Sequence, residues 1–209
     1  ESVFESMERL HVDYIDLSLM CMHRVCRVDF PSNENETLPT LVELREKGLV
    51  GHVGITDLQH ENLKWFIDRV PEGTVESVLN FCHYSLNDDR LADFLDYFEA
   101  KGIGVINASP FSMGLLSQRG VPEWHPAPAA LVEACRKASD IAAQGYPIEK
   151  LAIQFSVSNP RIGTTLFSSA NPDNVLKNIQ YIEEPIDWDL VAKVKEIIGD
   201  QQRVTWKNT

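Results

Sequence analysis

The sequence has no apolar run close to the roughly 18 to 20 residues that a membrane-spanning helix needs. Positive charge is also scarce, because 19 lysines and arginines stand against 31 aspartates and glutamates, for a net charge of -12. Such an acidic surface repels nucleic-acid phosphates and anionic lipid headgroups. We therefore expect neither nucleic acid nor membrane as a partner, and the sequence does not indicate any partner protein.

The four cysteines, Cys21, Cys26, Cys82 and Cys135, are scattered and form no CxxC pair. Scattered cysteines in a chain of this length are typical of reduced thiols in a cytoplasmic protein. The six histidines lack HExxH spacing, so we predict no metal site. The GxxxxGK[ST] loop and the GxSxG elbow are absent as well, which argues against P-loop phosphoryl transfer and against an α/β-hydrolase serine.

What the sequence does contain is a regular alternation of β-strand and α-helix patterns. Strands are expected over residues 12–20, 50–56, 76–82, 103–109 and 164–169. Helices are expected over residues 2–11, 37–48, 61–70, 88–102, 148–157 and 188–198, with two more around 131–138 and 175–179. Strands and helices that alternate through short loops predict an α/β fold with a parallel sheet.

Two parallel architectures remain open on this pattern. A doubly wound nucleotide fold usually carries a glycine-rich motif after its first strand, and none is present here. A (β/α)8 TIM barrel typically needs about 250 residues. With five visible strands, a barrel would be incomplete and would lack roughly its first three strands. A hydrophobic content of 44% fits one domain over 1–209 in either case.

Several stretches resemble the aldo-keto reductase family, and they occur in the family's order along the whole chain. They are DYIDLSL (13–19), LVGHVGITDL (49–58), INASPFSMGLL (106–116) and SSANPDNVLKNI (168–179). The resemblance begins at the helix before the family's fourth strand. It implies an incomplete (β/α)8 TIM barrel, a nicotinamide cofactor across the carboxyl ends of the strands, and an NAD(P)-dependent oxidoreductase.

Two further stretches, NFCHYSLND (80–88) and PEWHPAP (122–128), resemble family members that oxidise L-galactose to its lactone, a step toward ascorbate in plants. The resemblance therefore implies a small sugar as the substrate. In PEWHPAP, Trp124 and His125 could cover the bound sugar or cofactor. Alternatively, the stretch is a proline-stiffened loop with Trp124 on the outside of the barrel.

Family catalysis uses a tyrosine as general acid/base, an aspartate and a lysine that tune it, and a histidine that orients the substrate oxygen. The first three come from early strands that we expect to be absent here, so none is assigned a position. This absence favours an alternative function, a catalytically silent fragment that retains at most nucleotide binding.

The catalytic histidine can be tested against the family pattern DLxLxH. Five residues after Asp16 stands Cys21, and His23 comes two residues later. A shift of two keeps the same face of a strand but moves the side chain by roughly 6 to 7 Å. Either a bulge restores His23 to the catalytic position, or His23 is a loop residue beside a cysteine in the histidine position.

The cofactor-binding positions match the family better. Thr56 and Asp57 stand where the family holds the nicotinamide carboxamide. The pyrophosphate loop matches at Ser109, Pro110, Phe111, Ser112, Gly114 and Leu115. Small residues there would let backbone N–H groups approach phosphate oxygens, although the loop could also be an ordinary turn between a strand and a helix.

The last motif bears on the choice of cofactor. Family members that prefer NADP grip its 2′-phosphate with a lysine and an arginine. The corresponding motif positions here are Ser168, Ser169, Asn174 and Asn178. Because these side chains are neutral, a phosphate dianion would lack charge-assisted hydrogen bonds, and we predict that NAD is preferred over NADP.

Overall fold

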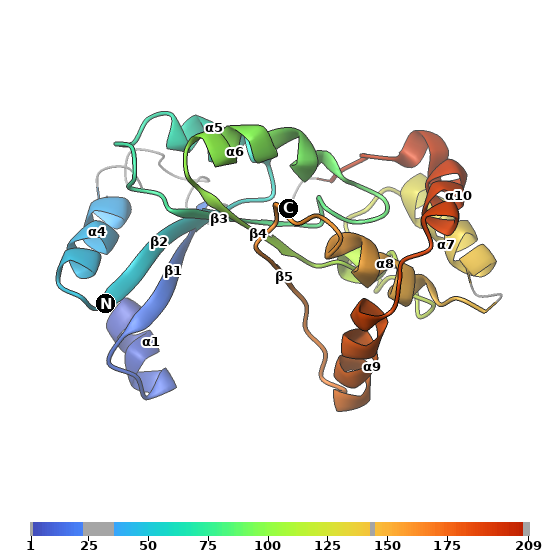
Figure 1. Ribbon diagram of the computed structural model, residues 1–209, viewed down its shortest axis with the longest axis horizontal. Helices are drawn as coiled ribbons and strands as arrows, with labels where there is room; N and C mark the ends of the chain where they lie inside the picture. Colours follow the sequence, from blue (N-terminus) through green and yellow to red (C-terminus); the bar gives the residue numbers. More distant parts are fainter. Residues whose placement is uncertain (1, 23–35, 143–144, 207–209) are drawn as a thin grey trace. The chain divides into compact units, whose positions relative to one another are not determined.

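The computed structural model describes residues 2–22, 36–142 and 145–206. Strands and helices alternate along them as the sequence predicts (Figure 1). The strands are β1 (Ile15–Cys21), β2 (Val50–Thr56), β3 (Ser77–Phe81), β4 (Gly104–Ala108) and β5 (Thr164–Leu166). The α-helices are α1 (Ser2–Leu10), α4 (Leu38–Glu46), α5 (His60–Ile67), α6 (Leu95–Ala100), α7 (Ala129–Ala142), α8 (Ile148–Ser156), α9 (Pro172–Glu183) and α10 (Trp188–Ile198). Short 3-10 helices are η2 (Arg90–Phe94), η3 (Ser112–Gly114) and η4 (Gly199–Gln201).

The five strands lie in one sheet in chain order, β1-β2-β3-β4-β5. The pairs β1/β2, β2/β3 and β4/β5 are parallel. Parallel neighbours need a crossover connection, and the helices between the strands supply it. The predicted parallel α/β sheet is therefore confirmed.

The chain divides into two compact units. The first unit comprises Glu1–Leu79 and Tyr97–Gly104, and the second comprises Asn80–Asp96 and Val105–Thr209. The prediction that 1–209 form a single domain stays a prediction.

The core of the first unit includes the apolar faces of α4, which packs against β2, and of α5. In α4, Leu38, Leu41 and Leu44 recur at helical spacing and are all buried. In α5, Leu63 and Phe66 are buried in the same way. Full burial of a side chain of this size stabilises the fold by about 1.5 to 3 kcal/mol. The helical apolar spacing seen in the sequence thus marks the side chains that the two helices bury.

The second unit is organised around α8. Seven of its residues are buried, and Gln154 is among them. The Gln154 amide donates hydrogen bonds to the carbonyls of Tyr181 at 2.7 Å and Glu184 at 2.9 Å. The Tyr181 carbonyl also accepts the Glu184 N–H at 3.3 Å, so Gln154 adds to the bonds that close the end of α9. At its other end, α9 begins with Pro172 after the capping side chain of Asn171.

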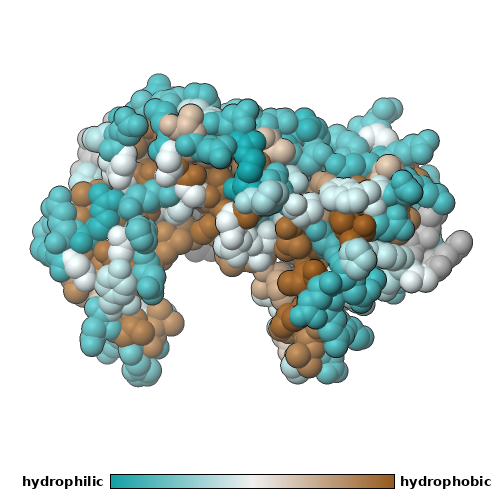
Figure 2. Space-filling view, in the orientation of Figure 1, coloured by the Kyte–Doolittle hydropathy of each residue, from teal (hydrophilic) through white to brown (hydrophobic). Residues whose placement is uncertain are grey.

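Some large apolar side chains stay in contact with solvent. On α9 they are Leu176, Ile179 and Ile182. Figure 2 shows apolar surface over this helix. None of the helices in the described ranges combines the length and the apolar character needed to cross a bilayer.

Candidate nucleotide-binding site

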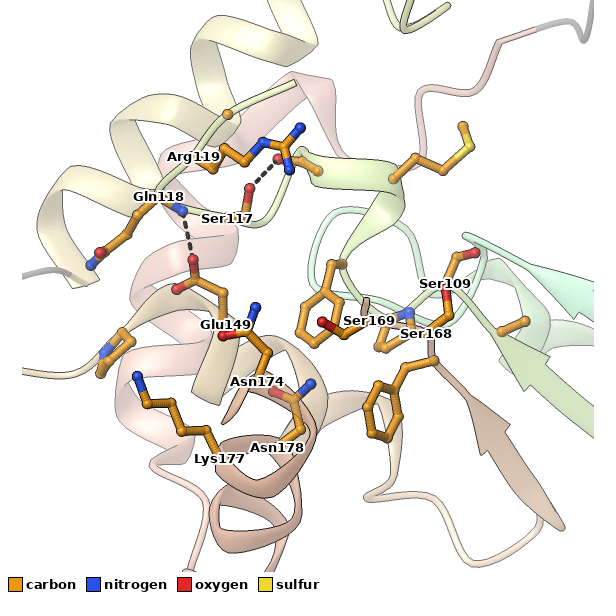
Figure 3. A pocket seen from close by; sticks show the side chains of 18 of the residues that line it. Ser109, Ser117, Gln118, Arg119, Glu149, Ser168, Ser169, Asn174, Lys177 and Asn178 are labelled. Atoms are coloured by element: carbon orange, nitrogen blue, oxygen red, sulfur yellow. Dashed lines mark hydrogen bonds between the residues drawn. The ribbon is translucent and has the colours of Figure 1, made fainter. Parts of the chain in front are cut away.

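A cleft of about 960 Å³ lies within the second unit. Its walls come from the loop after β4, the segment after β5 and one face of α9 (Figure 3). Eight of the predicted cofactor-binding residues line it: Ser109, Pro110, Phe111, Gly114, Ser168, Ser169, Asn174 and Asn178. Residues 109 and 178 are far apart in the sequence, so the fold brings the two predicted motifs to one place.

The loop after β4 has an unusual backbone. Ser109, Ser112 and Met113 have φ values of 60°, 46° and 55°, and Gly114 has a φ of 111°. Such left-handed conformations in non-glycine residues are costly and persist only where surrounding contacts impose them. They give the loop a tight curve, in which the N–H groups of Ser112, Gly114 and Leu115 donate to carbonyls of the loop itself. The predicted approach of many backbone N–H groups to a phosphate is therefore not what this loop offers.

A buried hydrogen-bond network holds this loop from beneath. The Ser112 hydroxyl donates to Asn87 Oδ1 at 2.6 Å and lies 3.0 Å from the Ser85 hydroxyl. The three side chains are fully buried, so their bonds are not exposed to competing water. Ser112 and Leu115, both predicted to bind cofactor, are buried and are not among the residues that line the cleft. Sequence reasoning could not distinguish the two sides of this loop.

Gly114 fits the loop for two reasons. Its φ of 111° suits glycine, and a Cβ at this position would lie 3.0 Å from the Gly120 carbonyl oxygen. The approach of these two backbone segments closes the loop against residues 117–120. There the Ser117 hydroxyl donates to the Gly114 carbonyl at 2.9 Å.

One face of α9 forms the opposite wall. Asn174, Lys177, Asn178 and Tyr181 are spaced by three, four and seven residues and all line the cleft. Residues at this spacing share a face of a helix. Lys177 and Tyr181 were missed by comparison with motif positions, and the helical period alone would have found them.

Two cations line the cleft, Arg119 and Lys177. Figure 3 shows them on opposite sides of it. Within the described residues, neither forms an ion pair, and the carboxylate in the lining, Glu149, accepts a hydrogen bond from the Gln118 backbone N–H at 2.7 Å. Positive charge at the cleft contrasts with the net charge of -12 of the whole chain. The cleft is therefore suited to an anion, which the neutral motif positions did not reveal.

Thr56 and Asp57, the remaining predicted cofactor residues, lie in the first unit. Thr56 ends β2, where it is in register with Cys21 at the end of β1. Asp57 is almost fully buried, and its carboxylate accepts a hydrogen bond from the Gln59 N–H at 2.8 Å. A carboxamide-binding role for the pair stays a prediction. His23 lies outside the described residues.

The segment after β3 forms a buried polar cluster in the second unit. His83 Nδ1 lies 3.1 Å from Asn80 Oδ1, and its Nε2 lies 3.2 Å from Thr205 Oγ1. Burial raises the pKa of the neighbouring Cys82 thiol to about 12. A buried thiol that stays protonated is a poor nucleophile, so Cys82 contributes packing here.

Comparison with known proteins identifies the chain's family. Residues 1–199 match the model of the aldo/keto reductase family. The chain belongs to this family. Aldo/keto reductases are oxidoreductases that use nicotinamide cofactors.

Two curated relatives are sugar dehydrogenases by name. L-galactose dehydrogenase of Arabidopsis thaliana is 37% identical over 99% of this chain and 66% of its own length. D-arabinose 1-dehydrogenase of Saccharomyces cerevisiae is 30% identical over 75% of this chain and 48% of its own length. The chain thus spans about half to two thirds of the length of these aldo/keto reductases.

Solved aldo/keto reductases share the fold. The holo form of an aldo-keto reductase from Bacillus halodurans superposes with a TM-score of 0.70 at 22% identity, over 97% of this chain and 69% of the other. A glycerol dehydrogenase from Gluconobacter oxydans gives 0.68 at 16%, over all of this chain and 65% of the other. The five parallel strands are accordingly part of a (β/α)8 barrel, as the resemblance implied.

The residues of the cleft fit a nicotinamide dinucleotide. Its serine hydroxyls and asparagine amides can pair with ribose hydroxyls and phosphate oxygens. The two cations, Arg119 and Lys177, suit a pyrophosphate. A dinucleotide needs a long, partly apolar groove with a few polar groups, and the apolar side chains of Phe111, Phe167 and Tyr181 complete such a lining.

Proposed function

We propose that this chain belongs to an NAD-linked dehydrogenase that oxidises a galactose-like sugar. The observation that carries the proposal is the cleft in which the two cofactor motifs meet. The names of the Arabidopsis and yeast relatives support a sugar as the substrate. In this reaction bound NAD+ would accept a hydride from the anomeric carbon of the sugar, and the hydroxyl on that carbon would release its proton to solvent. The products would be a lactone and NADH.

The residues of the chain have distinct parts in this proposal. Ser109 and the loop that follows it bind the pyrophosphate, and Asn174 and Asn178 bind the adenosine end. Thr56 and Asp57 bind the nicotinamide carboxamide. His23 is the catalytic candidate that would orient the sugar oxygen.

The charges in the cleft support the proposed preference for NAD. NAD carries two negative charges on its pyrophosphate, and Arg119 and Lys177 are the two cations in the lining. NADP adds a phosphate that carries nearly two more charges. The motif positions Ser168 and Asn174 offer it neutral groups. At these motif positions themselves, the added charge would lack a matching cation.

Isothermal titration calorimetry with NAD+ and with NADP+ tests this preference. We expect NAD+ to bind this chain more tightly. The double variant S168K/N174R should improve NADP+ binding by about tenfold, whereas the neutral control N174Q should not. Tighter binding of NADP+ than of NAD+ to the unmodified chain would refute the preference.

Hydride transfer is tested by the absorbance of NADH when the chain is mixed with NAD+ and L-galactose. Turnover by the unmodified chain that is lower in the H23A variant would support the dehydrogenase function. NAD+ binding without turnover supports a second function, a nucleotide-binding chain that is catalytically silent. This second outcome is worth testing because the chain spans 66% of the length of the Arabidopsis enzyme.

We further propose a cytoplasmic location. Cys82 and Cys135 are free and buried, which is compatible with a reducing compartment. Labelling of the thiols in freshly prepared cell extract, with and without prior reduction, would test this.

A further inference from the structure

Trp124 stands out among the side chains that line the cleft. It is 70% exposed, more than any other large apolar side chain in the described ranges. A single exposed apolar residue needs no explanation on its own. Trp124, however, combines its exposure with a place in the wall of the cleft and with a rigid support.

The support begins with the backbone. The His125 N–H donates to the Pro122 carbonyl at 3.0 Å, which closes a turn around Trp124. The indole stacks on the His125 ring, with centroids 6.2 Å apart and planes 20° apart. The His125 ring in turn contacts the buried Trp206 edge-on at 5.1 Å. Trp124 is therefore supported on one side by a ring that is itself packed, which lowers the entropy cost of binding.

His125 also links Trp124 to the loop after β4. Its Nδ1 accepts a hydrogen bond from the Ala127 N–H at 3.1 Å, so Nε2 carries the proton and donates to the Ser112 carbonyl at 3.1 Å. The ring is thus neutral and held in one tautomer. Through this ring, one residue fixes both the indole and the left-handed loop.

We propose that Trp124 stacks on a flat heteroaromatic ring of the dinucleotide, adenine or nicotinamide, and that His125 is its positioning residue. The inference rests on the proposed function and deepens it. An indole face can stack on a sugar as well as on a base. The two cations in the same lining favour a charged nucleotide over a neutral sugar. Base stacking on an aromatic side chain is also largely independent of base identity.

The first test measures binding of NAD+, AMP, nicotinamide mononucleotide and L-galactose by calorimetry. W124A should weaken NAD+ binding roughly tenfold, and W124F should restore most of the loss. The mononucleotide that shows the same loss identifies the stacked ring. W188A is the matched control, because Trp188 is exposed but is not among the lining residues, and it should leave the affinity for NAD+ unchanged.

The second test uses tryptophan fluorescence. NAD+ should quench the unmodified chain and W188A, and the quench should be largely lost in W124F. H125F keeps a ring beneath the indole but removes both hydrogen bonds. It should weaken NAD+ binding and reduce the quench, whereas a variant that only lowers stability would keep the quench at saturation.

The outcomes separate this inference from the proposed function. Failure of the unmodified chain to bind NAD+ would overturn both. Binding of NAD+ by W124A with unchanged affinity would overturn the stacking role alone. A loss of affinity confined to L-galactose would show that Trp124 contacts the sugar and would equally overturn it.

Discussion

At the scale of single residues, Gly114 joins backbone geometry to ligand binding. In G114A the left-handed φ would be strained and the new Cβ would press on the Gly120 carbonyl. We expect a loss of about 1 to 3 kcal/mol in the free energy of unfolding and a weaker affinity for NAD+. Urea denaturation and calorimetry would measure the two effects.

The matched control is G102A. Gly102 has a φ of 67°, and a Cβ there would meet no atom within 4 Å. It is also absent from the lining of the cleft. G102A should lower stability through backbone strain while leaving NAD+ affinity unchanged. Equal affinities for NAD+ in G114A and G102A would contradict the role assigned to the loop.

Single residues also show which parts of the candidate site could be predicted from the sequence. Ser109, Ser168 and Asn178 could be predicted because each stands in an ordered motif, and they meet in the cleft. Arg119 and Lys177 lie outside the motif positions and were found from the structure. A comparison limited to motif positions overlooks residues between those positions. Such residues can still lie beside the motif residues in the folded chain.

At the scale of elements, η2 is tied to the end of the chain by charge. Asp89 accepts hydrogen bonds from Lys195 at 2.6 Å and Arg203 at 2.8 Å. Burial on its own would raise the pKa of Asp89, but these two cations lower it below its usual value. Lys195 belongs to α10, so one carboxylate connects three segments of the second unit.

This arrangement predicts a dependence of stability on pH. A carboxylate whose pKa is lower in the folded state stabilises the fold above its unfolded pKa of about 3.9, and the contribution is lost as pH falls through the folded value. At pH 7 we expect D89N to cost about 1 kcal/mol, a modest figure because Arg203 is partly exposed. The difference in the free energy of unfolding between the unmodified chain and D89N, measured by urea denaturation, should shrink below pH 4. A difference that does not change with pH would contradict the ion pairs.

Elements also show the limits of sequence patterns. The spacing predicted β2 and α10 with their observed bounds. It predicted one helix over 88–102, where the structure has η2 followed by α6. The Asp88 carboxylate accepts from the N–H and the side chain of Arg90, a local bond that competes with regular helix formation. The spacing of apolar residues gives no information about such a local hydrogen bond, so the sequence pattern could not predict the break.

At the scale of the whole molecule, the sheet ends in β1 and β5. A closed barrel has no edge strands, whereas an open sheet presents unpaired backbone groups to other chains. Exposed apolar side chains on α1 and α9, among them Phe4 and Leu176, add to this tendency. The architecture could be predicted because strand and helix patterns alternate along the sequence. The exposed apolar faces could not, because they depend on which helix faces pack against the rest of the chain.

We therefore expect the isolated chain to unfold less cooperatively, and to be less soluble, than a complete barrel of the family. Circular dichroism melts of this chain and of the Arabidopsis relative, at matched concentrations, would measure the difference. Light scattering should show association that grows with concentration. A sharp, reversible two-state melt of a monomer would contradict the expectation.

The last described residues of the chain support the cleft from outside its lining. Thr205 bonds to His83, and Trp206 packs against the ring that supports Trp124. Two contacts thus separate the end of the described chain from the cleft. We expect the loss of Trp206 to weaken ligand binding although it removes no lining residue.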